Sequence, residues 1–194
     1  MRRFLFFVVF SVILVSYFAR VNAQNTTFAV DVQQLSRGEI SYSKLAGVFV
    51  GRNFENSHFG GWNYTAVTPD WGEFLVGPST HFMLDDRYVE FGAGAGVEQP
   101  GFVLRGAIYG TIVGEKFSAL VFLEHGKGTG FWYFARAVHK IAGAFSAGLH
   151  AQRYFGVGPK FQFDFGPTKI WTAPVYDYES DKHWGLGAGI GVSF

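Results

Sequence analysis

Apolar residues alternate with small or polar ones along almost the whole of this 194-residue chain. The stretch 160–165 reads KFQFDF, with a Phe at every second position, and the chain closes on WGLGAGIGVSF, with a Gly or Ser at alternate positions. A period of two places successive side chains on opposite faces of a β-strand, whereas a helix requires a period near 3.6. No stretch of useful length has the helical period. The alternation therefore predicts an all-β fold.

Turn-forming residues interrupt the alternation at short intervals. Segments such as TPDWG, LDDR, EQPG and EHGKGTG carry Gly, Pro, Asp and His between the apolar runs. Gly, Pro and Asp supply the backbone angles and side-chain hydrogen bonds that turns require. The runs between them number twelve, and they predict strands near 26–35, 44–51, 58–68, 73–82, 87–97, 102–113, 116–124, 130–138, 141–152, 157–165, 169–177 and 184–194.

The composition fits strands and excludes several chemistries. The chain has 23 Phe and 26 Gly, and only 16% of its residues are charged, against about 25% in a typical soluble domain. It has no Cys, which rules out a disulfide framework, a thiolate metal site and a cysteine nucleophile.

The N-terminus has the pattern of a secretory signal peptide. Arg2 and Arg3 precede an apolar stretch, Phe4 to Phe18, and a small-x-small site ends at Ala23. A retained membrane anchor is the alternative, but about 15 residues is short of the ~20 that a spanning helix needs. We expect residues 1–23 to be removed after Sec-dependent export, leaving one domain, 24–194. Loss of these residues takes away three arginines and leaves 13 basic against 15 acidic residues, with no basic cluster for nucleic acid.

Two environments could accept an apolar face on every strand. In a soluble sandwich or barrel this face points inward and the outside is charged. In a membrane barrel the apolar face meets lipid and the inside is polar or small. Here the face opposite the aromatic residues carries Gly, Ala, Ser, Thr, Asn and Gln with isolated charges. This distribution favours the membrane barrel, whose sheet must close on itself because hydrocarbon offers the backbone no hydrogen bonds.

The chain resembles the small bacterial outer-membrane β-barrel proteins. The resemblance covers nearly all of residues 26–194. It includes a last strand that ends on Phe194 and carries apolar residues at alternate positions before it: Leu186, Ala188, Ile190 and Val192. It implies a closed, antiparallel, up-and-down transmembrane barrel in the bacterial outer membrane. It also implies contact with outer-membrane lipid and lipopolysaccharide, and recognition of the last strand by the barrel-assembly machinery. It implies no cofactor and specifies no subfamily or oligomeric state.

The number of strands in such a barrel is even. The turns favour twelve strands, with ten or eight as alternatives. With twelve, EHGKGTG and VYDYESDKH fall on the outer side, while GEK, HK and GPT fall on the periplasmic side with both termini. GRNFENS is long for a periplasmic turn. Pro78 and Pro174 lie inside predicted strands, where each removes a ladder hydrogen bond.

The charged and polar residues on the inner face are the predicted lumen lining. Opposite charges in a confined interior should pair across strands. Trp132 and Phe134, beside Arg136, favour a narrow or blocked lumen. The predicted set is Glu90, Arg105, Tyr109, Glu124, Arg136, His150, Lys160 and Asp164.

Ser79 and His81 suggest a hydrolase as a minor alternative. They share a strand face about 7 Å apart, and Glu73 lies on the same face as a candidate acid. The order is the reverse of the His-x-Ser pattern of outer-membrane lipid deacylases. No His-x-His or His-Glu-x-x-His motif occurs, so no metal site is predicted. Asp177, Glu179 and Asp181 alternate in one predicted outer loop, and we interpret them as solvated charges.

Three functions follow, in order of preference. The first is a non-enzymatic outer-membrane barrel that serves as a structural protein or as a narrow pore for small solutes. The second is a barrel-embedded lipid hydrolase using Ser79 and His81. The third is a secreted soluble barrel that binds an apolar ligand. The direction of the Phe161, Phe163 and Phe165 row separates the third from the others, because a membrane barrel must turn it outward.

Overall fold

The computed structural model describes residues 26–37, 40–181 and 183–193, and it places them in a closed barrel of twelve strands. The alternating segments form the strands because β-branched, aromatic and small residues fit a pleated surface. The strands are β1 (Thr26–Arg37), β2 (Ile40–Asn53), β3 (Phe59–Val67), β4 (Gly72–Leu84), β5 (Arg87–Gln99), β6 (Val103–Val113), β7 (Phe117–Gly126), β8 (Gly130–Ala142), β9 (Phe145–Gln152), β10 (Gly156–Phe165), β11 (Thr168–Tyr176) and β12 (Trp184–Ser193).

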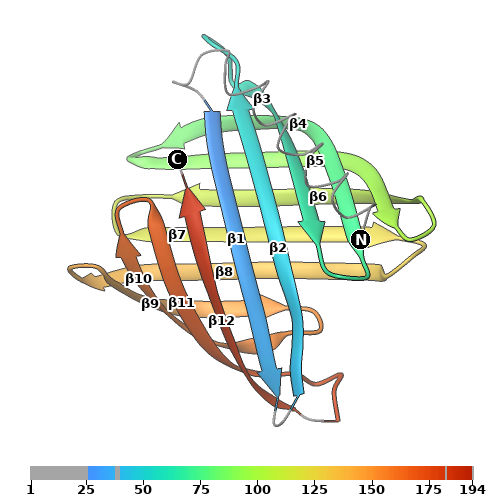
Figure 1. The fold of residues 1–194 in the computed structure, drawn as a ribbon. Helices are drawn as coiled ribbons and strands as arrows, with labels where there is room; N and C mark the ends of the chain where they lie inside the picture. Colours follow the sequence, from blue (N-terminus) through green and yellow to red (C-terminus); the bar gives the residue numbers. More distant parts are fainter. Residues whose placement is uncertain (1–25, 38–39, 182, 194) are drawn as a thin grey trace.

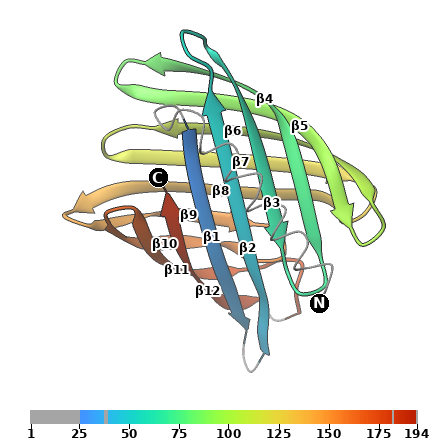
Figure 2. The same cartoon turned by 45° about the horizontal axis from the view of Figure 1, so that its top comes forward.

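Every strand pairs antiparallel with its neighbours in the sequence, and β1 closes the barrel against β12. The seam runs in regular register from Ala29 opposite Ser193 to Ser36 opposite Leu186. In Figures 1 and 2 the blue β1 and the red β12 lie side by side, and the front strands cross those of the back wall steeply. Such crossing is the tilt that closing a sheet into a barrel requires. The barrel is an up-and-down meander, as the sequence predicted.

The even strand number brings both ends of the described chain to one end of the barrel, which we call the terminal end. The turns there span 54–58, 85–86, 114–116, 143–144 and 166–167. The opposite end, which we call the loop end, carries the longest connection, 177–183, and the other β-turns and loops between the strands. The five residues at 54–58 make the first turn of the terminal end long, as the sequence suggested.

The two faces of the barrel differ sharply. The row Phe161, Phe163 and Phe165 points outward and is 39–58% exposed. Leu104, Ile108, Leu149, Leu186 and Ile190 are likewise more than half exposed. Polar and charged side chains on the alternate positions are buried inside. The outer surface is therefore the apolar one.

The strand boundaries lie within two residues of the predicted ranges, except that β2 begins at Ile40 where 44 was predicted, and except near HK. His139 and Lys140 were expected to form a turn, but β8 continues through them to Ala142. Gly143, with a φ of 52°, makes the turn instead because glycine adopts this conformation without steric cost. A register irregularity between Lys140 and Ala142 accommodates the change.

Proline interrupts the ladder where β10 meets β11. The pairing lapses between Val157 opposite Tyr176 and Phe161 opposite Thr172, the segment that contains Pro159 and Pro174. Neither proline can donate a ladder hydrogen bond. Pro78 sits at a similar gap between β4 and β5, and its carbonyl oxygen accepts a hydrogen bond from Trp62 Nε1 at 3.0 Å.

Two predictions lie partly or wholly outside the described residues. These are the signal peptide at 1–23 and the terminal Phe194. Within the described residues, no helix is long and apolar enough to cross a membrane.

Candidate functional site: the barrel interior

Arg105 lies at the centre of a buried charged cluster near the loop end. Its Nη1 is 2.6 Å from Glu98 Oε2, its Nη2 is 2.8 Å from Glu124 Oε2, and its Nε is 3.3 Å from Glu73 Oε2. All four side chains are at least 95% buried. We call these four residues the Arg105 cluster. They come from β4, β5, β6 and β7, so their ion pairs link four neighbouring strands of the barrel wall.

Two loops are fastened onto the Arg105 cluster. Trp71 Nε1 donates to Glu98 Oε1 at 2.9 Å, and the backbone N–H of Thr129 donates to the same carboxylate at 3.1 Å. The Thr129 hydroxyl also contacts Arg105. The connections 68–71 and 127–129 are thus held over the lumen at the loop end.

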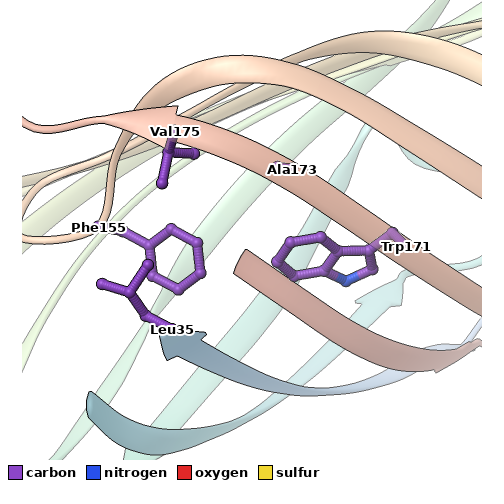
Figure 3. Close-up of a cluster of buried hydrophobic side chains, with 5 residues drawn as sticks. All are labelled: Leu35, Phe155, Trp171, Ala173 and Val175. Atoms are coloured by element: carbon purple, nitrogen blue, oxygen red, sulfur yellow. The ribbon is translucent and has the colours of Figure 1, made fainter. Parts of the chain in front are cut away.

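An apolar cluster fills the other side of the loop end. It consists of Leu35, Phe155, Trp171, Ala173 and Val175, and we call it the Phe155 cluster. Figure 3 shows the ring of Phe155 between Leu35 and Val175, with Trp171 alongside. These residues come from β1, β11 and the turn after β9, so the cluster fills space inside the barrel.

An ion pair reinforces the Phe155 cluster. Arg37 Nη2 lies 2.7 Å from Asp177 Oδ2, with both side chains over 90% buried, and the same nitrogen donates to the Phe155 carbonyl at 2.8 Å. The interpretation of Asp177 as a solvated loop charge was therefore wrong. Sequence spacing gave no sign that Arg37 on β1 would reach it.

Lys160 and His150 lie against the ring of Trp171. Lys160 Nζ is 4.0 Å from the ring centre, and the His150 ring stacks at 5.3 Å. Lys160 is 1% exposed and His150 is fully buried. Among the described residues, neither ring nitrogen of His150 has a hydrogen-bond partner, and no carboxylate lies within ion-pair distance of Lys160. The expectation that every lumen charge pairs with an opposite charge therefore fails at Lys160.

Aromatic rings pack across the lumen between β3 and the strands β6 and β7. Trp62 and Tyr64 lie 5.7 and 5.2 Å from Phe122, and Trp62 lies 5.1 Å from Tyr109. Partly buried Trp132 and Phe134 pack against this group. Both rings point inward, and with the other rings they narrow the lumen.

A cavity of about 640 Å³ remains between these packed regions. Aromatic side chains form much of its wall, among them Phe49, Tyr64, Phe122, Trp132 and Phe134. Thr27, Tyr88 and Ser193 also line it, and they lie at or next to the strand ends of the terminal end. The cavity thus reaches the terminal end, while the Arg105 and Phe155 clusters fill the loop end.

A second cavity of about 320 Å³ lies beside the first at the terminal end and shares part of its wall. The turn 114–116 and Gly166 form part of its wall, with Lys116 and Lys140 as its outer cations. Arg136 and Lys169 line both cavities and so stand where the two meet.

The charges of the larger cavity are held in different ways. Arg136 Nη1 lies 3.7 Å from Asp31 Oδ2, and both side chains are about one-third exposed. Glu90 accepts hydrogen bonds from Tyr109 at 2.5 Å and from Tyr88 at 2.8 Å. Asn53 Nδ2 donates to the Tyr88 hydroxyl at 3.0 Å, which completes this network.

The structure places the predicted lumen set inside the barrel but spreads it over separate groups. Arg105 and Glu124 lie in the Arg105 cluster, Glu90 and Tyr109 share one network, and Lys160 and His150 stack on Trp171. Asp164, half-buried near the terminal end, accepts from Gln162 at 2.8 Å and Ser146 at 3.3 Å. Glu98, Arg37, Asp31 and Lys169 were missed as lumen residues, and Glu73 was named only as a candidate acid beside Ser79 and His81. Their position on inward faces was the available signal.

Ser79, His81 and Glu73 do not come together as a catalytic group. Ser79 is 4% exposed and faces the interior, while the His81 ring stacks on Tyr88 at 5.8 Å. Glu73 is six residues from Ser79 along β4, about 20 Å in an extended strand, and is engaged by Arg105. No group of three or more potential metal ligands within the described ranges has a geometry suited to a metal ion.

Solved structures share this fold. A structure of the KdgM porin is 11% identical over an alignment that covers 86% of this chain and 99% of that chain, with a TM-score of 0.54. A KdgM porin in complex with disordered oligogalacturonate gives 12% identity, the same coverage and the same TM-score. The structure described as "Unveiling the Mechanism Behind the in-meso Crystallization of Membrane Proteins" is 9% identical, covers 87% of this chain and 83% of its own, and has a TM-score of 0.63.

The likeness to these structures concerns the fold. No family model matches the chain, and no curated protein matches it.

Proposed function

We propose that this protein is an integral barrel of the bacterial outer membrane that provides a narrow, non-enzymatic pathway for small solutes, closed at the loop end in the resting state. The apolar outer surface fits a hydrocarbon environment, and the closed ladder pairs most of the strand backbone within the barrel, as hydrocarbon requires. The fold shared with the KdgM porin structures supports the same assignment.

The observation that carries the proposal is the asymmetry of the interior. A cavity of about 640 Å³ reaches the terminal end, and packed side chains block its continuation toward the loop end. The cavity is the part of the interior that the side chains of the described residues leave open, and it opens toward one end alone. A pathway closed by a few side chains needs a cavity on one side of the block.

Planar-bilayer conductance tests the pathway. The triple variant Arg37→Ala, Phe155→Ala and Asp177→Ala removes the ion pair and the central ring of the Phe155 cluster. We expect the wild-type protein, closed in the resting state, to conduct only during occasional openings. The triple variant should carry at least twice its mean current, because the block is thinner.

A matched control changes the same two loops without touching the lumen. Arg153→Ala, Tyr154→Ala and Glu179→Ala removes an exposed pair, with 3.4 Å between Arg153 Nε and Glu179 Oε2, and an exposed ring. This control is expected to conduct like the wild type. A correctly folded Phe155 triple variant whose current equals that of protein-free bilayers would overturn the pore and leave the structural role.

The lack of enzymatic activity is part of the proposal. Ser79 is turned away from the surface that lipid would contact, and Glu73 is engaged elsewhere. We therefore expect no release of fatty acid from phospholipid or lipid A vesicles by the wild type. Hydrolysis that Ser79→Ala abolishes would restore the hydrolase alternative.

Lipid, lipopolysaccharide and the assembly machinery are the proposed partners. The residues Trp184, Leu186 and Ile190 of β12 point outward and are 52–70% exposed. They are therefore accessible to an assembly protein that recognises this strand from outside the barrel. The outward direction of Phe161, Phe163 and Phe165 speaks against the soluble barrel with an apolar interior. A protein that stays monomeric in buffer without detergent would overturn the membrane assignment.

A further inference from the structure

The larger cavity has two chemically different walls. Aromatic rings of β2, β3, β7 and β8 form one side, including Phe122, Trp132 and Phe134. Asp31, Arg136 and Lys169 lie on β1, β8 and β11 and give the cavity its charged groups, together with Glu90. A volume of about 640 Å³ lies within the range of small-molecule sites, which combine an apolar wall with a few polar groups.

Three carboxylates line the two cavities near Arg136 and Lys169, and two of them, Glu90 and Asp164, are held by hydrogen bonds. Glu90 accepts from two tyrosine hydroxyls, and Asp31 faces Arg136. Asp164 stands opposite Lys169 in the β10–β11 ladder, but its oxygens accept from Gln162 and Ser146. Glu90 and Asp164 are therefore occupied by these hydrogen bonds, whereas Asp31 Oδ1 has no hydrogen-bond partner among the described residues.

The cations are held more loosely. The 3.7 Å separation between Arg136 and Asp31 is long for a charge-assisted hydrogen bond, and both side chains are partly solvated. In the part of the chain that the structure describes, Lys169 has no carboxylate within ion-pair distance. Arg136 and Lys169 balance Asp31 and Glu90 in the larger cavity. In the second cavity they add to Lys116 and Lys140 against Glu115 and Asp164, which leaves two positive charges in excess there.

The approach from the terminal end is consistent with an anion. Lys116 and Lys140 line the outer cavity, which continues to Arg136 and Lys169. Glu115 and Asp164 lie there too, and Asp164 is engaged as described. Cations along a narrow low-dielectric passage raise the local concentration of a negatively charged solute.

We propose that the cavity binds a small organic monocarboxylate with a flat apolar body, its carboxylate between Arg136 and Lys169 and its ring against Trp132, Phe134 and Phe122. The guanidinium plane suits two-point contact with a carboxylate, and the rings stack on a planar body. This inference rests on the proposed function, since it names the class of solute that enters the pathway.

Titration calorimetry on the full chain folded in detergent tests the site with 2-naphthoate. The comparison probes are 2-naphthamide, which keeps the ring without the charge, 2-(aminomethyl)naphthalene, which reverses the charge, and acetate, which lacks the ring. We expect 2-naphthoate to bind at least about tenfold more tightly than each of the others, because it alone makes both contacts.

Substitutions assign the binding to the cavity. Lys169→Gln and Arg136→Gln are each expected to lower the affinity for 2-naphthoate by about tenfold. Lys127→Gln, on an exposed residue of the 127–129 connection, is the matched control and should leave binding unchanged. Equal affinity for the naphthoate and the naphthamide, or no loss in either cavity variant while the barrel stays folded, would overturn the proposal.

The two proposals fail separately. Naphthoate binding without any conductance, even in the Phe155 triple variant, would retain the site and reject the pore. Conductance without selective naphthoate binding would retain the pore and reject the carboxylate site.

Discussion

The ring of Phe155 lies directly over Gly187, in the space that a Cβ atom at position 187 would occupy. Gly189, two residues further along β12, lies beneath Trp171 in the same way, with 2.6 Å between a Cβ there and the ring atom Cε2. Gly187 and Gly189 therefore make room for the rings of the Phe155 cluster. This is a packing role, distinct from conformational freedom.

Gly187→Ala should destabilise the barrel by about 1–3 kcal/mol, because the added methyl group overpacks a filled interior. Gly191→Ala is the matched control on the same face of β12. Its nearest neighbour would be the Val30 carbonyl oxygen at 3.6 Å, so we expect a neutral effect or a gain of up to about 1 kcal/mol. Urea unfolding in lipid vesicles, followed by Trp fluorescence, gives both values. Equal effects at the two positions would contradict the packing role.

Arg105→Met should cost about 3–5 kcal/mol of unfolding free energy, because it leaves three buried carboxylates without their cation. Arg87→Met is the control. Arg87 Nε lies 4.0 Å from Asp86 Oδ1 with both side chains more than half exposed, and its loss should change stability by less than about 0.5 kcal/mol. The same unfolding assay compares them. If the two variants were equally stable, the Arg105 cluster would not hold its wall together.

Asp31→Asn should strengthen the binding of 2-naphthoate several-fold. The amide no longer competes for Arg136, and the cavity gains one net positive charge. Asp181→Asn, on an exposed residue of the 177–183 connection, should have no effect. Calorimetric titration at low and at high salt measures both, and the gain should shrink at high salt because screening weakens the attraction. Weaker binding of 2-naphthoate by the Asp31→Asn variant would mean that the ligand's carboxylate does not bind at Arg136.

Ile108→Arg should destabilise the barrel by about 2–4 kcal/mol in lipid vesicles, whereas Leu104→Arg should cost at most about 1 kcal/mol. Both residues point outward from β6 and are more than half exposed, but Ile108 lies mid-strand and Leu104 near the loop end. A charged side chain lowers the unfolding free energy most in the middle of the hydrocarbon and little at its edge. Unfolding in vesicles against a detergent-solubilised reference measures the difference. If neither substitution changed the unfolding free energy in vesicles, this face of β6 would not contact lipid.

The strands and their faces could be predicted because both depend on local pattern. The row Phe161, Phe163 and Phe165 specifies its outward face through a period of two, and Gly and Asp specify the turns. The prediction failed at His139 and Lys140, where two strand-compatible residues were taken for a turn and Gly143 provides the real one. At this turn the glycine adopts the positive φ, which neither His139 nor Lys140 would adopt without steric cost.

The contents of the lumen could be predicted only in part. Alternation shows that Arg105 faces inward, but its three carboxylate partners come from strands whose register the sequence does not specify. Arg37 and Asp177 lie at opposite ends of the chain, and their meeting depends on the closure of the barrel. Lys160 differs from Arg105, because its buried ammonium lies over the ring of Trp171 where a carboxylate was expected.

The seam between β1 and β12 has a consequence for how the molecule is made. Its two strands are the first and the last of the described chain, so the hydrogen bonds of Ala29 to Ser36 must wait until nearly all other residues have been synthesised and delivered. Until then β1 offers an unsatisfied edge to its surroundings. An edge left open in this way can pair with another strand, and closure of the barrel is the step that removes it.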